Sequence, residues 1–441
     1  MKQPLFLTVL LTSFVLAGCG KSSAPKPVAQ EQQKSTEVAA SSEPTPQSPL
    51  PKYLQEAVRL ISIKEFTKAE QELTRLLVDH ADDSQVYALR AGLFASSGRG
   101  KEALTDLNRA IELAPKNTDH LYARGLLYLT ARMLNQAVQD FQSVVQLKPD
   151  HPQAANNLAL IYVTQGDYDR GIREFDQILK RDSKRGDVLN NRGLAHWKAG
   201  HFELALADFN SALQLNPKNV NTLSNRGQLY YSQARFDEAV SDFTSATAYD
   251  PYNLTHFQNR QMAYLKKGRL VEAEENGKRI VWLRKLFQLQ REHQKHPESA
   301  DLRIQLARHF MEGKEFDKAA LFLDDLLSRN SKLIPALLGR AELRTQQQQW
   351  AKVIEDCSAV LAQEDSFDAR SLRGDAYFQL RKLDEAIADY EASQRFDAQV
   401  ADAYYQRSRK RQSAGDPAGA KADLAHAQEL NPKLSTAASG D

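Results

Sequence analysis

Small residues recur at a fixed step of 34 residues along most of this chain. Each lies inside a stretch whose apolar residues follow a helical period. Where two helices cross closely, a longer side chain forces their axes apart, and overpacking such a position costs about 1 to 3 kcal/mol. The step therefore predicts an array of similar helical units. Counted from Ala69, the next small residues are Ala103, Ala137, Gly171, Ala205, Ala239 and Ala273.

Other residue types keep the same register. An aromatic residue follows the small residue by four positions and a proline by twelve, while a second small residue precedes it by twelve. Proline ends the second helix of a unit and suits the first turn of the next, where its missing N–H is not needed. The aromatic residues are Phe141, Phe175, Phe209, Phe243 and Tyr390; the prolines are Pro115, Pro149, Pro217, Pro251 and Pro432; the preceding small residues are Gly125, Ala159, Gly193 and Gly227.

This combination resembles the tetratricopeptide repeat (TPR) family closely. The resemblance implies an all-α fold, a TPR solenoid in which helix-turn-helix repeats form a right-handed superhelix. We count eleven units, and the register shifts by 12 residues near 288–299. We therefore expect a first array of about seven repeats over 52–287, an irregular helical extension or insertion over 288–299, a second array of about four repeats over 300–434 and a C-terminal tail over 435–441.

The first residues indicate secretion. The apolar stretch after Lys2 is too short to span a membrane comfortably and is typical of a cleaved signal peptide. It ends in Leu-Ala-Gly-Cys at 16–19, which resembles the lipobox of bacterial lipoproteins. The resemblance implies a lipoprotein signal peptide over 1–18 and a thioether-linked diacylglycerol on Cys19, and two or three acyl chains would anchor the protein stably. An ordinary signal peptide with an unrelated cysteine is the alternative.

Residues 20–51 are rich in Ser, Pro, Gln, Glu, Ala and Lys and have no repeating apolar stripe. Such a segment cannot bury enough surface to fold. We expect 19–51 to form the lipidated cysteine and a disordered tether that spans roughly 30 Å on average. Gly20 stands where, among bacterial lipoproteins, an aspartate would favour the inner membrane. The resemblance therefore implies the cell envelope, at the outer membrane facing the periplasm.

Composition argues against nucleic acid as a partner and against catalysis. The net charge is only +2 with 26% charged residues, so no basic field attracts nucleic acid. The ten histidines show no metal-ligand spacing, and the sequence has no phosphate-binding loop or nucleophile motif. Cys357 stands where other units carry Phe or Tyr, which predicts a small buried core residue. We expect no cofactor, no metal and no enzyme activity.

A charged pattern repeats with the units. Numbering each unit from its first residue, position 7 is an arginine on the packing face of the first helix, and an aspartate follows sixteen residues later. Where the arginine is missing the aspartate is missing too, as in Leu158 with Glu174 and Leu306 with Phe322. A buried guanidinium needs a partner, so we predict structural ion pairs within repeats, although pairing with the neighbouring repeat's aspartate stays open. The pairs are Arg90 and Asp106, Arg124 and Asp140, Arg192 and Asp208, Arg226 and Asp242, Arg340 and Asp356, Arg373 and Asp389, and Arg407 and Asp423, with Asn276 opposite Arg260.

An asparagine row runs along the opposite face of the first helices. In solenoids of this kind that face is expected to line the concave surface. An asparagine side chain carries a donor and an acceptor and can hold the backbone of an extended peptide regardless of its sequence. The row is similar to the asparagine ladder of the TPR superhelix in O-linked N-acetylglucosamine transferases. Its members are Asn157, Asn191, Asn225 and Asn259 at position 6, with Asn156 and Asn190 beside them, and we expect Trp197, Lys198, Tyr231 and Lys266 to flank it.

The alternative for the row is a set of solvated polar residues inherited through repeat duplication. Outside this block, however, position 6 varies, as Leu89 and Ala123 illustrate. A second candidate site is the irregular middle of the chain, where basic residues exceed acidic ones between Arg260 and His296. Residues from Ile280 to Phe287 extend the second helix of unit seven there. A long packing helix is one interpretation, and a hinge or a basic docking site is the other.

These observations favour a non-catalytic, lipid-anchored TPR scaffold or adaptor in a bacterial envelope complex. Its partners would be proteins, bound as extended peptide segments or envelope assembly components on the concave surface, with the membrane reached through the lipid anchor. A structural spacer of the envelope without saturable ligand binding is the alternative. A targeting subunit of an enzyme complex is a further one. The sequence carries no signal for the oligomeric state.

Overall fold

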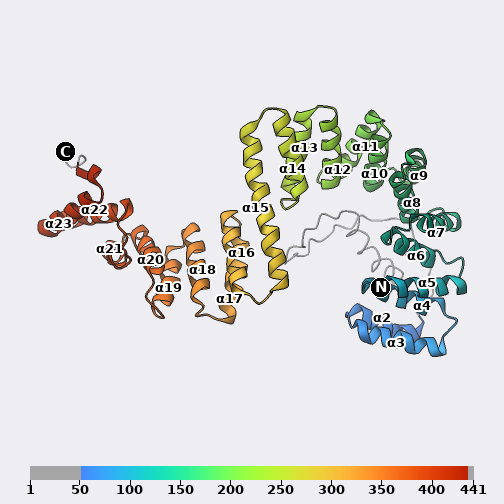
Figure 1. Ribbon diagram of the computed structural model, residues 1–441, viewed down its shortest axis with the longest axis horizontal. Coiled ribbons are helices and arrows are strands. Elements are labelled where there is room, and N and C mark those ends of the chain that lie inside the picture. Colours follow the sequence, from blue (N-terminus) through green and yellow to red (C-terminus); the bar gives the residue numbers. More distant parts are fainter. Residues whose placement is uncertain (1–50, 436–441) are drawn as a thin grey trace. The chain divides into compact units, whose positions relative to one another are not determined.

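The computed structural model of the protein describes residues 51–435 and is built of helices alone within them (Figure 1). It contains 22 α-helices, and no strand occurs among the described residues. The predicted all-α TPR solenoid is confirmed. The predicted signal peptide, Cys19, most of the tether and residues 436–441 of the tail lie outside the described residues.

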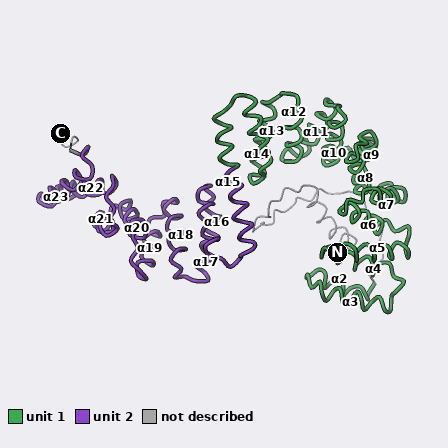
Figure 2. Tube along the Cα trace, viewed as in Figure 1, with its two compact units in different colours: residues 1–280 green, residues 281–441 purple. Residues whose placement is uncertain are grey.

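The chain divides into two compact units, residues 1–280 and residues 281–441 (Figure 2). Helices pair in chain order, so repeat 1 is α2 with α3 and repeat 7 is α14 with α15. The first unit contains η1 (Lys52–Leu54), α2 (Gln55–Ser62), α3 (Phe66–Asp79), α4 (Ser84–Ser96), α5 (Gly100–Leu113), α6 (Thr118–Thr130), α7 (Leu134–Leu147), α8 (Pro152–Thr164), α9 (Tyr168–Arg181), α10 (Gly186–Lys198), α11 (Phe202–Leu215), α12 (Val220–Ser232), α13 (Phe236–Tyr249), α14 (Leu254–Lys266) and the start of α15 (Leu270–Lys295).

The second unit carries repeats 8 to 11. After the remainder of α15 it contains α16 (Ala300–Glu312), α17 (Phe316–Arg329), α18 (Ile334–Gln346), α19 (Trp350–Leu361), α20 (Phe367–Gln379), α21 (Leu383–Ala392), α22 (Ala398–Ser413), α23 (Pro417–Leu430) and η2 (Pro432–Ser435).

Helix α15 accounts for the register shift in the sequence. It has 26 residues, whereas most second helices, such as α13, have 14, and the difference equals the 12-residue shift. The apolar residues beyond Ile280 continue this one helix, as predicted. Both the division between the two units and the predicted array boundary at 287 fall inside it.

The recurring small and aromatic residues pack directly on each other. A Cβ atom added to Gly125 would lie 2.7 Å from the ring of Phe141, and one added to Gly227 would lie 2.7 Å from Phe243. Both phenylalanine rings are completely buried. A larger residue at either glycine would therefore push the two helices of its repeat apart. This contact explains why the two residue types keep a constant separation along the sequence.

The arginine and aspartate of each predicted pair form two hydrogen bonds with one another. In repeat 6, Arg226 donates from Nε and Nη2 to the two carboxylate oxygens of Asp242, at 2.9 and 2.7 Å. The aspartate is buried and the arginine is partly exposed. The carboxylate raises the pKa of Arg226, since its hydrogen bonds favour the charged guanidinium. The same two-bond geometry occurs in Arg90 with Asp106, Arg124 with Asp140, Arg192 with Asp208, Arg340 with Asp356, Arg373 with Asp389 and Arg407 with Asp423.

The third guanidinium nitrogen, Nη1, donates to a residue of the preceding repeat, but not to the aspartate that would pair with that repeat's own arginine. Nη1 of Arg226 donates to Asn210 on α11 at 2.7 Å. One arginine therefore joins three helices, its own, the second helix of its repeat and the second helix of the repeat before. The spacing in the sequence predicts only the aspartates as partners of these arginines. The residues that accept this additional bond are Thr74, Asn108, Asp176, Asn210, Asp324, Ser358 and Asp384, and Thr247 accepts the equivalent bond from Arg260.

Two repeats show what replaces the pair. In repeat 7, Arg260 donates to the neutral Asn276 at 2.8 Å, and burial lowers the pKa of Arg260 because no carboxylate offsets the desolvation. In repeat 8 the pair is absent: Leu306 is buried, and Phe322 stacks on Phe310 with ring centroids 5.9 Å apart. Apolar packing therefore substitutes for the ion pair within the same chain.

Arg226→Leu is expected to lower the free energy of unfolding by about 3 to 5 kcal/mol, because it leaves the carboxylate of Asp242 buried without its partner. The double variant Arg226→Leu/Asp242→Phe copies the residues of repeat 8 and should recover most of the loss. Thermal melting followed by circular dichroism measures both effects. A melting temperature that the single variant leaves unchanged would contradict a stabilising role for the pair.

Candidate functional site: the inner face of unit 1

The first helices of consecutive repeats contact one another, as α8 with α10, α10 with α12, and α12 with α14 (Figure 1). Second helices of consecutive repeats make no comparable contact in the described part of the chain. The first helices therefore lie closer together and form the inner side of the array. This is the face on which the sequence placed the asparagine row.

The asparagines at position 6 bridge neighbouring first helices. Nδ2 of Asn191 donates to Oδ1 of Asn156 at 3.1 Å, and Nδ2 of Asn225 donates to Oδ1 of Asn190 at 3.0 Å. Asn157 makes the equivalent bond to the hydroxyl of Tyr122 at 3.3 Å. In each case the acceptor is position 5 of the preceding repeat, 35 residues earlier. We call these three contacts the amide bridges.

The amide bridges merge into one network. Nδ2 of Asn190 also donates to Oδ1 of Asn191 at 3.3 Å. Hydrogen bonds thus run from Asn225 through Asn190 and Asn191 to Asn156, across α12, α10 and α8. Sequence analysis missed this internal role. Its signal was present, because a polar side chain stands at position 5 of the preceding repeat in each of these cases.

The bridges leave part of the row's hydrogen-bonding capacity unused. The Oδ1 atoms of Asn157 and Asn225 accept no hydrogen bond from the described residues, and Oδ1 of Asn191 accepts one although it has two lone pairs. All three side chains are half-buried, so they reach the inner surface. Because each amide already uses one N–H in a bridge, its orientation is fixed. The row therefore presents pre-oriented acceptor oxygens.

The network ends at repeat 7. Position 5 of the preceding repeat is Ser224, whose hydroxyl accepts from Gln228 at 3.4 Å. Nδ2 of Asn259 is consequently buried without a hydrogen-bond partner. Of the four asparagines at position 6, three thus form bridges and the fourth does not.

The predicted flanking residues divide into two groups. Trp197 and Tyr231 are half-buried and pack on core clusters of buried residues, Trp197 on the cluster of Ala205, Phe209 and Leu229. Much of their aromatic surface therefore stabilises the repeats. Lys198 and Lys266 are exposed, and the ammonium of Lys198 lies 5.2 Å from the centre of the Trp197 ring.

Met262 is an inner-face residue that the sequence analysis did not select. It stands at position 9 of its repeat, one of the positions predicted to face inward, and is 49% exposed. Leu160 and Leu194 occupy the same position in repeats 4 and 5 and are half-buried. The inner face thus combines amide oxygens with apolar side chains at position 9 of repeats 4, 5 and 7, whereas repeat 6 has Gln228 there.

No cluster of His, Cys, Asp and Glu within 51–435 could hold a metal ion. Over the same range no helix is long and apolar enough to cross a bilayer. Cys357 is completely buried as predicted, and burial raises the pKa of its thiol to about 12.

Comparison with known families agrees with the repeat geometry. Sequence models described as tetratricopeptide repeat match residues 54–118, 161–220 and 337–401, residues 128–190, and residues 220–253, together more than half of the chain. The chain therefore belongs to the tetratricopeptide repeat family. No curated protein matches its sequence.

Solved structures of several repeat proteins are similar. A tetratricopeptide repeat protein from Parabacteroides merdae has 18% identity and a TM-score of 0.40, covering 56% of this chain and 93% of that one. PilF from Pseudomonas aeruginosa has 17% identity and a TM-score of 0.41, covering 48% and 94%. YrrB, described as a TPR protein with an unusual peptide-binding site, has 16% identity and a TM-score of 0.37, covering 43% and 97%.

A buried histidine lies beside the end of the amide network. His256 is 5% exposed, and neither ring nitrogen has a hydrogen-bond partner. At the equivalent position of repeat 3, His120 contacts the hydroxyl of Ser84 at 3.2 Å. Burial lowers the pKa of His256, while Asp250 acts in the opposite direction. Burial also lowers the pKa values of His120, His151, His196 and His293.

Acidification is expected to destabilise the protein. The unfolded chain takes up protons on these histidines at about pH 6.5, whereas the folded protein resists protonation, so stability is complete above that pH and declines below it. Melting temperatures at pH 7.5 and pH 5.5 measure the loss. His256→Leu should make it smaller, and His426→Gln, at an exposed histidine, serves as the control. An equal loss in His256→Leu and the unmodified protein would contradict the role given to His256.

Proposed function

We propose that this protein is a non-catalytic adaptor that captures extended segments of partner proteins along the inner face of repeats 4 to 7. The observation that carries the proposal is the set of amide oxygens on Asn157, Asn191 and Asn225 that the amide bridges leave unused. Backbone N–H groups of an extended segment are the matching donors. Side-chain preference would come from Met262 and from the exposed Lys198.

The energetics require several contacts together. Each hydrogen bond contributes only about 0.5 to 1.5 kcal/mol net, because the ligand gives up bonds to water. Ordering a side chain at an interface usually costs about 0.5 to 1.5 kcal/mol more. The amide bridges reduce this second cost, since they hold the asparagines in place in the free protein. A pre-oriented row can therefore bind where flexible side chains would not.

A structural spacer is the second candidate function. It is favoured by one observation, namely that the asparagines and Trp197 already hold neighbouring repeats together. A spacer needs no free acceptor and would show no saturable binding. The unused oxygens favour the adaptor.

We further propose that Cys19 carries the lipid anchor and that the repeats work in the bacterial envelope, at the outer membrane facing the periplasm. The support is the Leu-Ala-Gly-Cys sequence at 16–19 followed by Gly20. Partner proteins would then be components of an envelope assembly.

The variant Asn191→Ala/Asn225→Ala is expected to reduce partner capture at least about tenfold, since the bonds made by two amides are lost together. Capture is measured by photo-crosslinking in membranes from a benzoylphenylalanine placed at Ser232, which is exposed on the first helix α12. The same probe at Gln177, exposed on the second helix α9, should yield no such product.

The matched control is Asn156→Ala/Asn190→Ala. It removes the same two amide bridges but leaves the amides of Asn191 and Asn225 in place. Both double variants should lose similar stability, but the control, which loses the pre-orientation and keeps the acceptor oxygens of Asn191 and Asn225, should lose clearly less capture. Equal loss of capture in the two would show that the asparagines act only as inter-repeat contacts, which is the result expected of a spacer.

Cys19→Ser is expected to move the protein from the membrane fraction to the soluble periplasmic fraction, because no thioether can form. Mass spectrometry of the N-terminal peptide should show the acyl mass only in the unmodified protein. Cys357→Ser, at the buried thiol, should leave the distribution unchanged. A membrane-bound, unmodified Cys19→Ser protein would contradict the anchor.

A further inference from the structure

Position 10 of the first helix is buried in repeats 2 to 10 but exposed in repeat 11. Position 10 of the first helix packs against the preceding repeat, as Leu229 does against Ala205 and Phe209. In repeats 2 to 10 this residue is at most 8% exposed. In repeat 11 it is Lys410, which is exposed. The buried residues are Leu93, Leu127, Ile161, Ala195, Leu229, Ala263, His309, Leu343 and Ala376.

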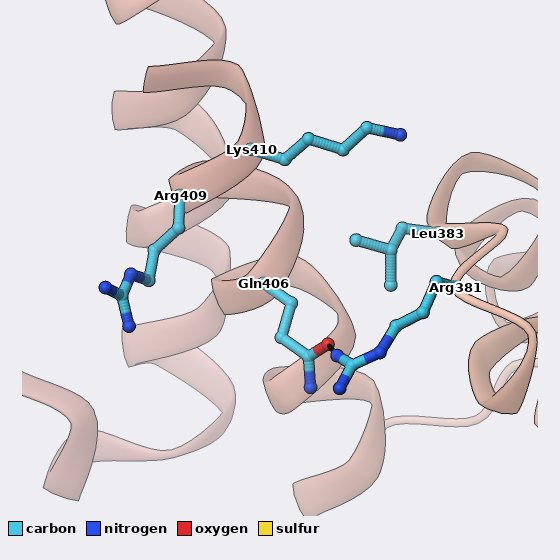
Figure 3. Close-up of a pocket in the computed structure, with 5 residues that line it drawn as sticks. All are labelled: Arg381, Leu383, Gln406, Arg409 and Lys410. Atoms are coloured by element: carbon cyan, nitrogen blue, oxygen red, sulfur yellow. Dashed lines mark hydrogen bonds between the residues drawn. The ribbon is translucent and has the colours of Figure 1, made fainter. Parts of the chain in front are cut away.

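A hollow opens on the surface beside Lys410. It has a volume of about 380 Å³ and is lined by Arg381, Leu383, Gln406, Arg409 and Lys410 (Figure 3). Helix α21, which forms one wall, has 10 residues instead of the usual 14. The junction between repeats 10 and 11 is thus built differently from the others in unit 2.

Two cations border the hollow without a carboxylate partner. Figure 3 shows Arg381 reaching across to Gln406 and Lys410 extending on the other side of Leu383, while Arg409 points away. Arg381 donates to Oε1 of Gln406, and Gln406 in turn donates to Asp402 at 2.8 Å. No carboxylate of the described residues forms an ion pair with Arg381 or Lys410.

The nearby aspartates are already engaged. Asp384 accepts from Arg407 at 3.1 Å, and Asp423 is paired with Arg407 and Arg411. The positive charge of Arg381 and Lys410 is therefore not neutralised locally. Since Gln406 holds Arg381 in position, part of its side-chain entropy is lost before any ligand binds.

We propose that this hollow binds the carboxylate of an acidic side chain in a protein partner. Arg381 can offer two parallel N–H donors to a carboxylate, and Lys410 adds a second positive charge. Leu383 provides apolar contact for the methylene groups of a glutamate. An extended polyanion fits less well, because charges that reach beyond the two cations would approach Asp384, the chain neighbour of Leu383, and Asp402, which accepts from Gln406. The site lies in unit 2 and does not depend on the asparagine row.

The test measures binding of a short fluorescein-labelled peptide with blocked ends and glutamates at alternate positions, by fluorescence anisotropy with the full chain. The double variant Arg381→Gln/Lys410→Gln should bind at least about tenfold more weakly, as should the counterpart peptide with glutamines. Folding should be retained, because Gln348 occupies the position of Arg381 in repeat 9 with the same positive φ of about 60°.

The matched control is Lys332→Gln/Lys352→Gln, which removes two exposed charges of unit 2 away from the hollow. It should bind the glutamate peptide within about twofold of the unmodified protein. Equal weakening in the two double variants would overturn the proposal, since bulk charge would then explain the binding. Binding of inorganic phosphate or of phosphatidylglycerol vesicles without binding of the glutamate peptide would also overturn it.

A single substitution separates binding from stability. Lys410→Leu restores the kind of residue that most other repeats bury at this position, so it should raise the melting temperature while it weakens peptide binding. A higher melting temperature with unchanged peptide affinity would contradict a site at Lys410. The double variant Asn191→Ala/Asn225→Ala leaves the hollow intact, so it should bind the glutamate peptide as tightly as the unmodified protein does. The two proposals can thus fail separately.

Discussion

Most repeats of the array are held together by the arginine at position 7 of the first helix. Its guanidinium holds the aspartate of its own second helix with two hydrogen bonds and, through Nη1, a polar residue of the preceding repeat. A helical repeat cannot bury its apolar face alone and is stable only when stacked on its neighbours. An interaction that joins three helices at once fixes both the pairing inside a repeat and the stacking between repeats.

The arginine, the small residues and the aromatic rings occupy the packing face of each repeat, so this face does not fix the residue types at positions 5, 6 and 9 of the first helix. In repeats 3 to 6, positions 5 and 6 nevertheless add contacts between repeats through the amide bridges. The chain uses this freedom differently in its two units. Repeats 4 to 7 carry asparagines at position 6, whereas repeat 11 carries Gln406 at position 6 and Arg409 at position 9.

The sequence predicted those parts that depend on spacing within one repeat. Arg226 and Asp242 lie sixteen residues apart, as do their counterparts in other repeats, and where the arginine is missing the aspartate is missing too. This joint presence and absence predicts the pair. Gly227 and Phe243 also keep a constant separation, because the two residues pack on each other. The amide bridges could not be derived in this way, because the offset between neighbouring repeats decides whether Asn191 meets Asn156. The packing of Trp197 and the hollow beside Lys410 likewise depend on helix lengths and tilts that no single repeat encodes. The predictions for Cys19 fall outside the described residues.

The junction between repeats 6 and 7 lacks the amide bridge that the junctions between repeats 3 and 6 have, because Asn259 forms none. His256 is also buried there without a hydrogen bond, while Arg260 still donates to Thr247 of repeat 6 at 2.8 Å but has only the neutral Asn276 as its partner within repeat 7. In a linear array, stability is roughly the sum of repeat and junction contributions, so unfolding begins at the weakest junction. Repeats 3 to 6 should accordingly melt as one cooperative block. Under mechanical load or heat, repeat 7 would detach from that block first.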